Sequence, residues 1–92
     1  MAIVATTIEV PAGGEDPTLL ITGDGNKYQL SRNGHHEIYV GGATVDTTIP
    51  DNAFKWEMGM LDLGVVESGD DLYAYNTGTS HIFVSVLSIT VT

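Results

Sequence analysis

The sequence contains no cysteine and little positive charge, and each absence excludes a class of function. Without cysteine the chain can form no disulfide, no thiolate metal site and no cysteine nucleophile. Its 92 residues carry 3 Lys and Arg against 12 Asp and Glu, which gives a net charge of −9 at pH 7. Phosphate backbones and anionic membranes bind clustered cationic side chains, so we expect neither nucleic acid nor membrane as a partner.

Long apolar runs are also missing. Residues 1–10 contain no Lys or Arg, and Thr6, Thr7 and Glu9 interrupt their apolar stretch, so a secretory signal is not expected there. No run approaches the roughly 20 apolar residues of a membrane-spanning helix. We therefore expect one domain, covering residues 1–92, that is soluble where it is synthesised. A domain of this size buries only a thin core, which makes association with other chains favourable.

β-branched residues and glycine dominate what is present. Of the 92 residues, 27 are Thr, Val or Ile, whose side chains fit a pleated sheet better than a helix. The 11 glycines and 3 prolines punctuate the chain between short apolar segments. Such segments at regular intervals predict an all-β fold, a single compact antiparallel β-sandwich or β-barrel-like domain of short strands.

Alternation of apolar and polar residues, bounded by turn residues, places the expected strands. Turns rich in Gly, Asn and Asp, such as residues 23–26 and 68–71, separate the strands because these residues adopt turn conformations readily. Apolar residues occupy even positions just before Gly59 and odd positions from Leu61 to Val65. A β-bulge at Gly59 is the expected cause of this change. The expected strands are residues 3–10, 18–22, 27–31, 35–40, 43–45, 54–65, 72–75 and 81–92.

The last expected strand, residues 81–92, is apolar on both faces. Ile82 and Val84 share one face, whereas Leu87 and Ile89 lie on the other. A half-buried strand with one register cannot show both patterns, because a slip of one residue exchanges the faces. Two explanations remain open: the strand bends midway between two sheets, or its end pairs with another subunit.

Candidate metal ligands and catalytic groups are few and scattered. His35 and His36 are neighbours that would point to opposite faces of a strand, so they cannot easily share one ion, and His81 lies far along the chain. Asp24 and the acidic pair at residues 70–71 fall in glycine-containing turns and lack the spacing of a calcium loop. No spacing joins Ser, His and Asp into a nucleophile and its base. We expect no enzyme, no cofactor and no metal site.

The aromatic residues permit two interpretations. Their side chains could form a carbohydrate-binding platform on one face of the domain. In a domain this small, such residues more often pack in the core or against a neighbouring subunit, and we favour that interpretation. The side chains concerned are Tyr28, Tyr39, Phe54, Trp56, Met58, Tyr73 and Tyr75.

Three stretches of the chain are similar to a known group of proteins. They are TIEVPAGGEDPTLLIT at residues 7–22, IYVGGATVDT at residues 38–47, and LDLGVVESGDDLYAYNTGTSHIFVSVLSI at residues 61–89. Together they resemble small virion proteins of tailed bacteriophages, of the head decoration or minor capsid type. The resemblance covers nearly the whole chain, although residues 49–56 depart from it as an insertion. It implies a β-sandwich without catalytic residues.

The resemblance implies a non-enzymatic structural virion protein. The expected function is capsid decoration: the protein would be made in the host cytoplasm, bind the outer surface of a phage head and stabilise it. The expected partners are the major capsid protein and further copies of the chain, as a homotrimer by the usual symmetry of such shells. The alternatives are a tail or head–tail connector component, and a receptor- or carbohydrate-binding module on the virion.

Three segments are expected to contact the capsid or a second subunit. Residues 1–10 are expected to act as an N-terminal contact arm or strand, and the loop at residues 11–17 is long enough to reach a partner. The aromatic segment would pack in the core or against a sister subunit. The candidate contact residues are Ala2, Ile3, Val4, Pro11, Pro17, Phe54 and Trp56.

Overall fold

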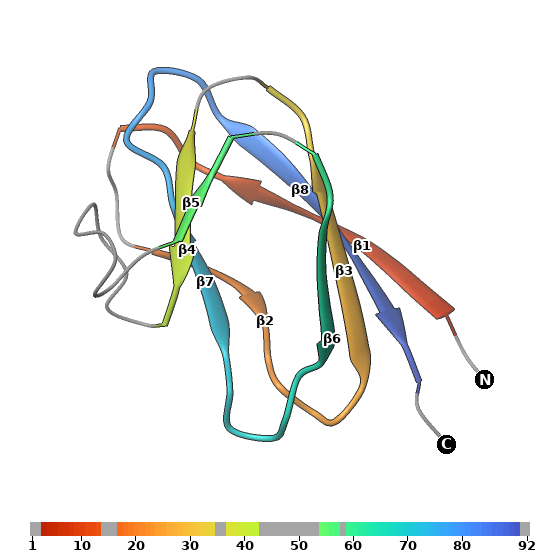
Figure 1. Cartoon of the computed structure of the whole chain (residues 1–92). Helices are drawn as coiled ribbons and strands as arrows, with labels where there is room; N and C mark the ends of the chain where they lie inside the picture. The colour runs from red at the N-terminus through yellow and green to blue at the C-terminus, as the bar shows by residue number, and fades with distance from the viewer. Residues whose placement is uncertain (1–2, 14–16, 35–36, 43–53, 58, 91–92) are drawn as a thin grey trace.

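The computed structural model describes residues 3–13, 17–34, 37–42, 54–57 and 59–90, and these residues form eight β-strands and no helix. None of the described residues therefore belongs to a helix that could span a membrane. The strands lie in two sheets of four (Figure 1). They are β1 (Ile3–Val10), β2 (Thr18–Ile21), β3 (Lys27–Arg32), β4 (Ile38–Gly41), β5 (Phe54–Trp56), β6 (Leu61–Val65), β7 (Leu72–Tyr75) and β8 (Ile82–Ile89).

The order of the strands defines the type of sandwich. One sheet has the order β1–β8–β3–β6, the other has the order β2–β7–β4–β5, and all neighbours are antiparallel. The first and last strands therefore pair with each other, and the chain passes repeatedly from one sheet to the other (Figure 1). Eight antiparallel strands connected in this order form a jelly roll. The prediction of an all-β antiparallel sandwich is confirmed.

The core lies between the two sheets and follows the alternation of each strand. In β8, Ile82, Val84 and Val86 are buried, whereas Phe83 and Ser85 between them are exposed. Burial with a period of two leaves the other side of each strand for the outer surface. The buried apolar residues are Val10, Leu20, Ile21, Tyr28, Leu30, Ile38, Val40, Trp56, Ala74, Ile82, Val84 and Val86.

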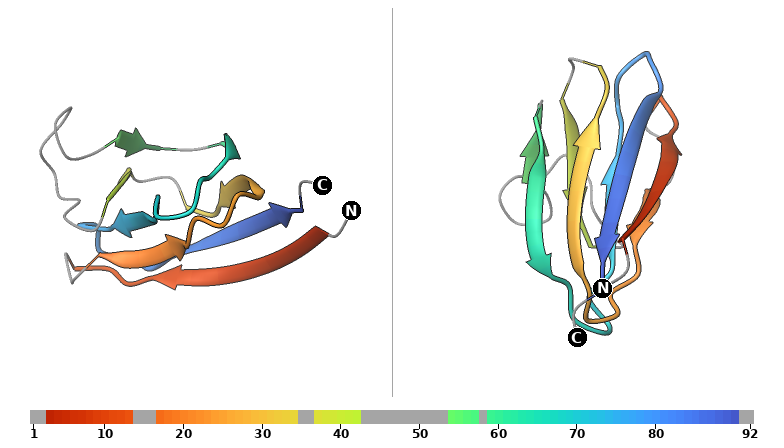
Figure 2. Two further views of the ribbon diagram at one scale, coloured as in Figure 1. Left: turned by 90° about the horizontal axis from the view of Figure 1, so that it is seen from below. Right: turned by 90° about the vertical axis from the view of Figure 1, so that its right-hand side faces the viewer.

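β1 and β8 form a long two-stranded ribbon. Their register is unbroken from the Ile3–Ile89 pair to the Val10–Ile82 pair. The ribbon leads to both ends of the chain and extends beyond the opposite sheet on that side (Figure 2). The strand expected at residues 3–10 is confirmed. Of the two explanations for the last strand, a bend between two sheets is wrong, because β8 stays in one sheet through Ile89.

The change of apolar phase around Gly59 has a different cause from the expected one. β5 and β6 belong to different sheets, so the chain crosses from one sheet to the other between Trp56 and Leu61. Gly59, with a φ of 86°, lies in this crossing. The register irregularity is found within β6, opposite Tyr28 and Gln29 of β3. The expected bulge at Gly59 is therefore wrong.

The remaining strands match the expected segments with small differences at their ends. β2 ends at Ile21, one residue earlier than expected, and β3 extends to Arg32. β4 begins at Ile38. Residues 35–36 and the strand expected at residues 43–45 lie outside the described residues.

One buried polar side chain fixes the connection between β7 and β8 to the end of β1. Asn76 is 2% exposed, and its amide nitrogen donates to the carbonyl oxygens of Val10 (3.2 Å) and Ser80 (2.9 Å). Its amide oxygen accepts from the backbone N–H of Gly78 (2.9 Å). Because both ends of the amide are satisfied, Asn76 can be buried without the cost of an unpaired polar group.

Candidate functional site

The outer face of the β1–β8–β3–β6 sheet presents apolar side chains at the surface. Its residues alternate with the buried ones along each strand, so they point away from the core. The exposed fraction is 63% for Ile3, 43% for Phe83 and 43% for Val65. We name this surface the β1/β8 face. Its described members are Ile3, Ala5, Thr7 and Glu9 of β1, Lys27, Gln29 and Ser31 of β3, Asp62 and Val65 of β6, and Phe83, Ser85, Leu87 and Ile89 of β8.

Strand pairing aligns these side chains in rows across the sheet. Ile3 and Lys27 both pair with Ile89, and Lys27 also pairs with Val65. Leu87 lies at the centre of the next row, two residues along β8. Directly paired residues have their Cβ atoms about 5 Å apart, so Ile3 adjoins Ile89 and Ala5 adjoins Leu87, whereas Lys27 lies between Ile89 and Val65. The adjoining apolar side chains of the β1/β8 face are therefore those of β1 and β8.

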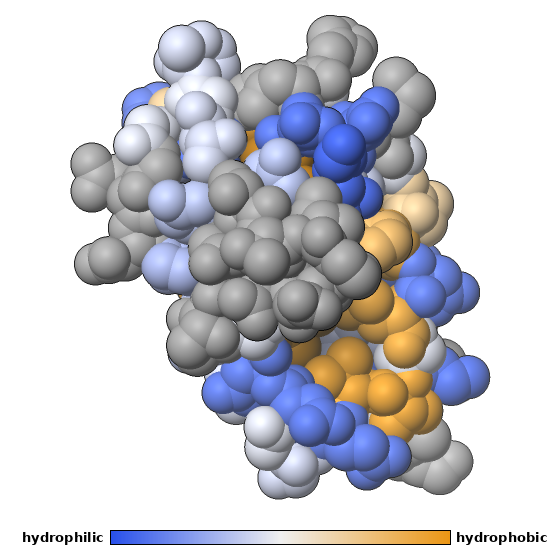
Figure 3. All heavy atoms as spheres, turned by 60° about the vertical axis from the view of Figure 1, so that its left-hand side comes forward, coloured by the Kyte–Doolittle hydropathy of each residue, from blue (hydrophilic) through white to orange (hydrophobic). Residues whose placement is uncertain are grey.

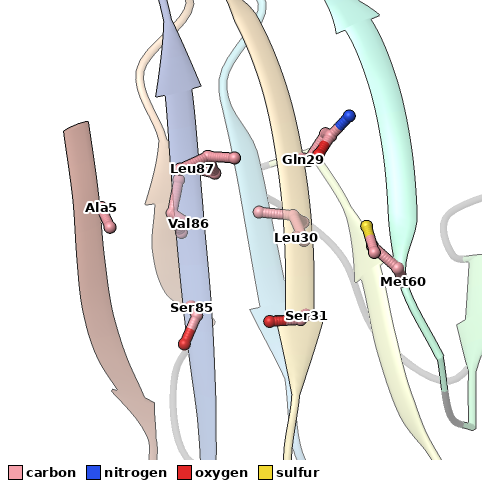
Figure 4. Close-up of a pocket in the computed structure, with 8 residues that line it drawn as sticks. All are labelled: Ala5, Gln29, Leu30, Ser31, Met60, Ser85, Val86 and Leu87. Atoms are coloured by element: carbon pink, nitrogen blue, oxygen red, sulfur yellow. The ribbon is translucent and has the colours of Figure 1, made fainter. Parts of the chain in front are cut away.

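A shallow depression lies on the β1/β8 face (Figure 4). Its volume is about 250 Å³. Ser31 and Ser85 are cross-strand partners, and their short side chains leave room beside the longer ones of Leu87 and Met60. Met60, at the border, is 65% exposed. The residues that line the depression are Ala5, Gln29, Leu30, Ser31, Met60, Ser85, Val86 and Leu87.

The β1/β8 face is nearly neutral although the chain is strongly acidic. Its ionisable side chains are Glu9, Lys27 and Asp62, so it carries one net negative charge against −9 for the whole chain. Interface cores have few charged residues, and exposed apolar patches with a polar border mark interaction sites. This face is therefore a candidate interaction surface.

On the opposite outer face, that of the β2–β7–β4–β5 sheet, tyrosine side chains cover one another, whereas Leu19 of β2, which pairs with Tyr73, is 41% exposed. Tyr39 is only 9% exposed, and Tyr73 and Tyr75 pack against it. The Tyr39 hydroxyl donates a hydrogen bond to Glu37 Oε1 (3.4 Å), and Glu37 Oε2 lies 3.3 Å from Lys55 Nζ. The hydrogen bond to Glu37 raises the pKa of Lys55. We name this surface the tyrosine face.

Trp56 belongs to the core. It is 2% exposed, and its indole Nε1 donates to the carbonyl oxygen of Gly59 (3.3 Å). The Arg32 guanidinium lies 5.5 Å from the centre of the indole ring and donates to the Trp56 carbonyl oxygen. Burial lowers the pKa of Arg32. Trp56 therefore offers no surface to a partner, and packing in the core is the correct interpretation for it.

The tryptophan and the tyrosines divide between the core and the tyrosine face. Tyr28 and Trp56 point into the core, whereas Tyr39, Tyr73 and Tyr75 lie on the tyrosine face. A carbohydrate-binding platform would need several exposed rings on one surface. On the tyrosine face Tyr39 is buried and Tyr73 and Tyr75 are half-buried, so these rings are only partly exposed.

The candidate contact residues are spread over the molecule. Ile3 lies on the β1/β8 face, whereas Val4 is on the core side of β1 and still 58% exposed. Pro11 and Pro17 are half-buried, just after β1 and just before β2. Ala2 lies outside the described residues. The structure thus brings only the N-terminal candidates next to the β1/β8 face.

Phe54 lies on the opposite sheet, in β5, and is 53% exposed. It borders a pocket of about 390 Å³ between β6 of one sheet and β4 and β5 of the other. Apolar side chains reach the surface on this side of the molecule (Figure 3). Met58, from the same aromatic segment, lies outside the described residues. Phe54 therefore lies outside the β1/β8 face, although Asp62 of that face also borders this pocket.

Two of the candidate metal ligands, Asp24 and His81, make hydrogen bonds within the chain. Asp24 Oδ2 accepts a hydrogen bond from the Tyr28 hydroxyl (2.9 Å), and burial together with this bond raises the pKa of Tyr28. His81 Nδ1 accepts from the backbone N–H of Ala12 (3.1 Å). Within the described ranges, no group of three or more His, Asp or Glu is placed to hold a metal ion. Residues 35–36 lie outside these ranges.

Comparison with known proteins assigns the chain to no family. No family model matches the chain, and neither does any curated protein or any solved structure. The resemblance to phage virion proteins therefore stays a prediction. The surface that sequence reasoning did not locate is the β1/β8 face, and its signal was the apolar pattern on both sides of the last strand.

Proposed function

We propose that this protein is a non-enzymatic structural component of a bacteriophage virion, a decoration protein that binds the outer surface of the capsid. The observation that carries the proposal is the β1/β8 face, where exposed apolar side chains and a shallow depression combine with almost no net charge. The resemblance of residues 38–47 and 61–89 to phage virion proteins supports a capsid as the partner.

The charge distribution suits such a role. Apolar residues of the β1/β8 face would be covered by the major capsid protein, which removes them from water. Most of the acidic residues lie outside this face and would remain in solvent, where like charge keeps particles apart. Jelly rolls occur in viral capsid proteins and in lectins, so the fold is compatible with the role without determining it.

Two other roles are distinguished by specific properties. A carbohydrate-binding module would need an exposed aromatic surface, and Trp56 and Tyr39 are buried. A tail or head–tail connector component would share the adhesive face but would be present in far fewer copies than a decoration protein. The number of copies in each particle therefore separates the connector from the decoration protein.

The composition of purified virions tests the proposal. We expect virions of the phage that encodes the chain to contain it in numbers comparable to the major capsid protein. We also expect a particle reconstruction to show it on the outside of the head, with the β1/β8 face against the shell. A copy number that fits a single ring would support the connector instead. Absence of the chain from virions would overturn the proposal, and a β1/β8 face pointing to solvent would overturn the assignment of the face.

A further inference from the structure

The two sheets of the described structure have four edge strands, β1, β6, β2 and β5. β1 differs from the other three. It is eight residues long, it pairs with β8 in unbroken register, and six of its residues are exposed. Residues 3–8 contain no charged residue, proline or glycine. An edge of this kind presents a regular row of backbone N–H and C=O groups, which is a template for a further strand.

The other three edges carry features that hinder pairing. β6 has five residues, an irregular register and Gly64 with a φ of 64°. β5 has only three residues and carries Lys55. β2 has four residues and an irregular register, and Pro17 directly precedes it. Short length, bulges, lysine and proline are the means by which natural sheets block edge-to-edge association. Residues 3–8 of β1 have none of the four.

We infer that β1 pairs antiparallel with β1 of a second copy of this chain, so that two four-stranded sheets join into one sheet across a two-fold axis. A second copy fits because an antiparallel pair of identical strands is self-complementary, and every molecule supplies the same edge. The net charge of −9 on each molecule opposes self-association. Residues 3–8 carry no charged side chain, so pairing at this edge adds no direct contact between acidic side chains.

The alternation of side chains restricts the register of this pair. A two-fold axis normal to the sheet keeps the core sides of both molecules on the same side, so each residue must pair with one of the same parity. Centring the pair on Ala5 leaves Glu9 outside it and places Val4 opposite Thr6 of the second copy. Cross-strand pairs of β-branched side chains stabilise antiparallel sheets.

The exposure of Val4 is a separate observation that fits this pair. Val4 points to the core side of the sheet and is nevertheless 58% exposed, at the end of β1 that extends past the opposite sheet (Figure 2). Together with Thr6 and Ile8 it borders a pocket of about 270 Å³. In the inferred pair, Thr6 of the second copy lies beside Val4 and covers part of its surface.

The inferred pair does not depend on the proposed function. It replaces the expected homotrimer by a dimer. Because the axis is normal to the sheet, the β1/β8 faces of both molecules lie on the same side of the joined sheet. Capsid binding and dimerisation therefore use different surfaces, and either can fail without the other.

Sedimentation equilibrium of the full chain tests the inference. The wild type is expected at twice the monomer mass of 9.8 kDa, with dissociation on dilution. Thr6→Lys is expected to be monomeric, because a lysine on an edge strand blocks pairing. The double variant Val4→Glu, Thr6→Lys sets opposite charges across the pair in the register above and is expected to restore the dimer. Leu19→Lys, an exposed position on the β2 edge, is the matched control and should remain dimeric.

Several outcomes would overturn the inference. They are a monomeric wild type at the highest attainable concentration, a trimer, and a dimeric Thr6→Lys variant with native circular dichroism. If Thr6→Lys does not fold, hydrogen exchange of the wild type decides. The amides of residues 3–7 that point away from β8 are expected to gain protection as the concentration rises, and exchange that is independent of concentration contradicts the pair.

Discussion

The two outer faces of the sandwich differ in what covers their large side chains. On the tyrosine face, Tyr39 is 9% exposed because Tyr73 and Tyr75 pack against it. On the β1/β8 face, Ile3 and Phe83 remain 63% and 43% exposed. Apolar side chains that pack together stabilise the isolated chain, whereas those that stay in water contribute only when a partner covers them. The first face therefore serves stability, and the second is available for binding.

The largest expected effect is the loss of stability on removing the buried tyrosine side chain from the tyrosine face. Tyr39→Ala should lower the free energy of unfolding by about 3 kcal/mol, the usual cost of removing a buried aromatic side chain. Urea unfolding, followed by the fluorescence of Trp56, measures this change. The control is Leu19→Ala on the same face, where the side chain is 41% exposed and the expected loss is below about 1 kcal/mol. Equal losses in both variants would contradict a self-covered face.

The next effect concerns binding by the β1/β8 face. Leu87→Asp should weaken rebinding to stripped capsids by about 10- to 100-fold, because a charge would be placed in the centre of the covered surface. Its free energy of unfolding should fall by no more than about 2 kcal/mol, since Leu87 is half-buried on the outer side of β8. Leu19→Asp, on the tyrosine face, is the matched control and should bind normally. If Leu19→Asp weakened capsid binding and Leu87→Asp did not, the tyrosine face would be the binding surface instead.

Salt should have a smaller effect. The β1/β8 face has one net negative charge, so capsid binding should change by less than about threefold between low and high ionic strength. Rebinding assays at several salt concentrations measure this dependence. A steep loss of affinity with salt would show that the acidic remainder of the chain binds a cationic capsid surface instead.

The smallest effect concerns the ion pair on the tyrosine face. The hydrogen bond to Glu37 raises the pKa of Lys55 above its usual value of 10.5. The contribution of this pair to stability is therefore complete below the pKa of the unfolded state and is lost as the pH rises through the folded-state pKa. In calorimetric scans the melting temperature of the wild type should fall slightly more than that of Lys55→Met in this alkaline range. A larger fall of the melting temperature in Lys55→Met would contradict a stabilising pair between Lys55 and Glu37.

Local sequence patterns predict most of the strands but not their partners. Residues 3–10 alternate with a period of two, and they form β1 as expected because alternation is a property of the strand alone. The pairing of β1 with β8 joins opposite ends of the chain, and no period encodes it. A crossing between sheets at Gly59 changes the apolar phase in the same way as a bulge does, so the sequence could not separate the two.

The candidate surface was predictable only in part. The apolar pattern on both sides of β8 indicates that one side has an additional role, and Leu87 and Ile89 do lie on the outer face. Trp56 is equally suited by its chemistry to a core and to an interface. Its burial depends on Arg32 and Gly59, which approach it only in the folded chain.

The pairing of β1 with β8 has a consequence for synthesis of the chain. β1 leaves the ribosome before the other described strands, yet β8, its neighbour in the sheet, is the last of them to emerge. Pairings between distant segments form slowly, and strand edges left unpaired meanwhile are prone to aggregate. Nascent chains on one polysome would hold their β1 segments close together during this delay. The stretch that we infer to join two finished molecules is therefore also the stretch that most needs protection while the molecule is being made.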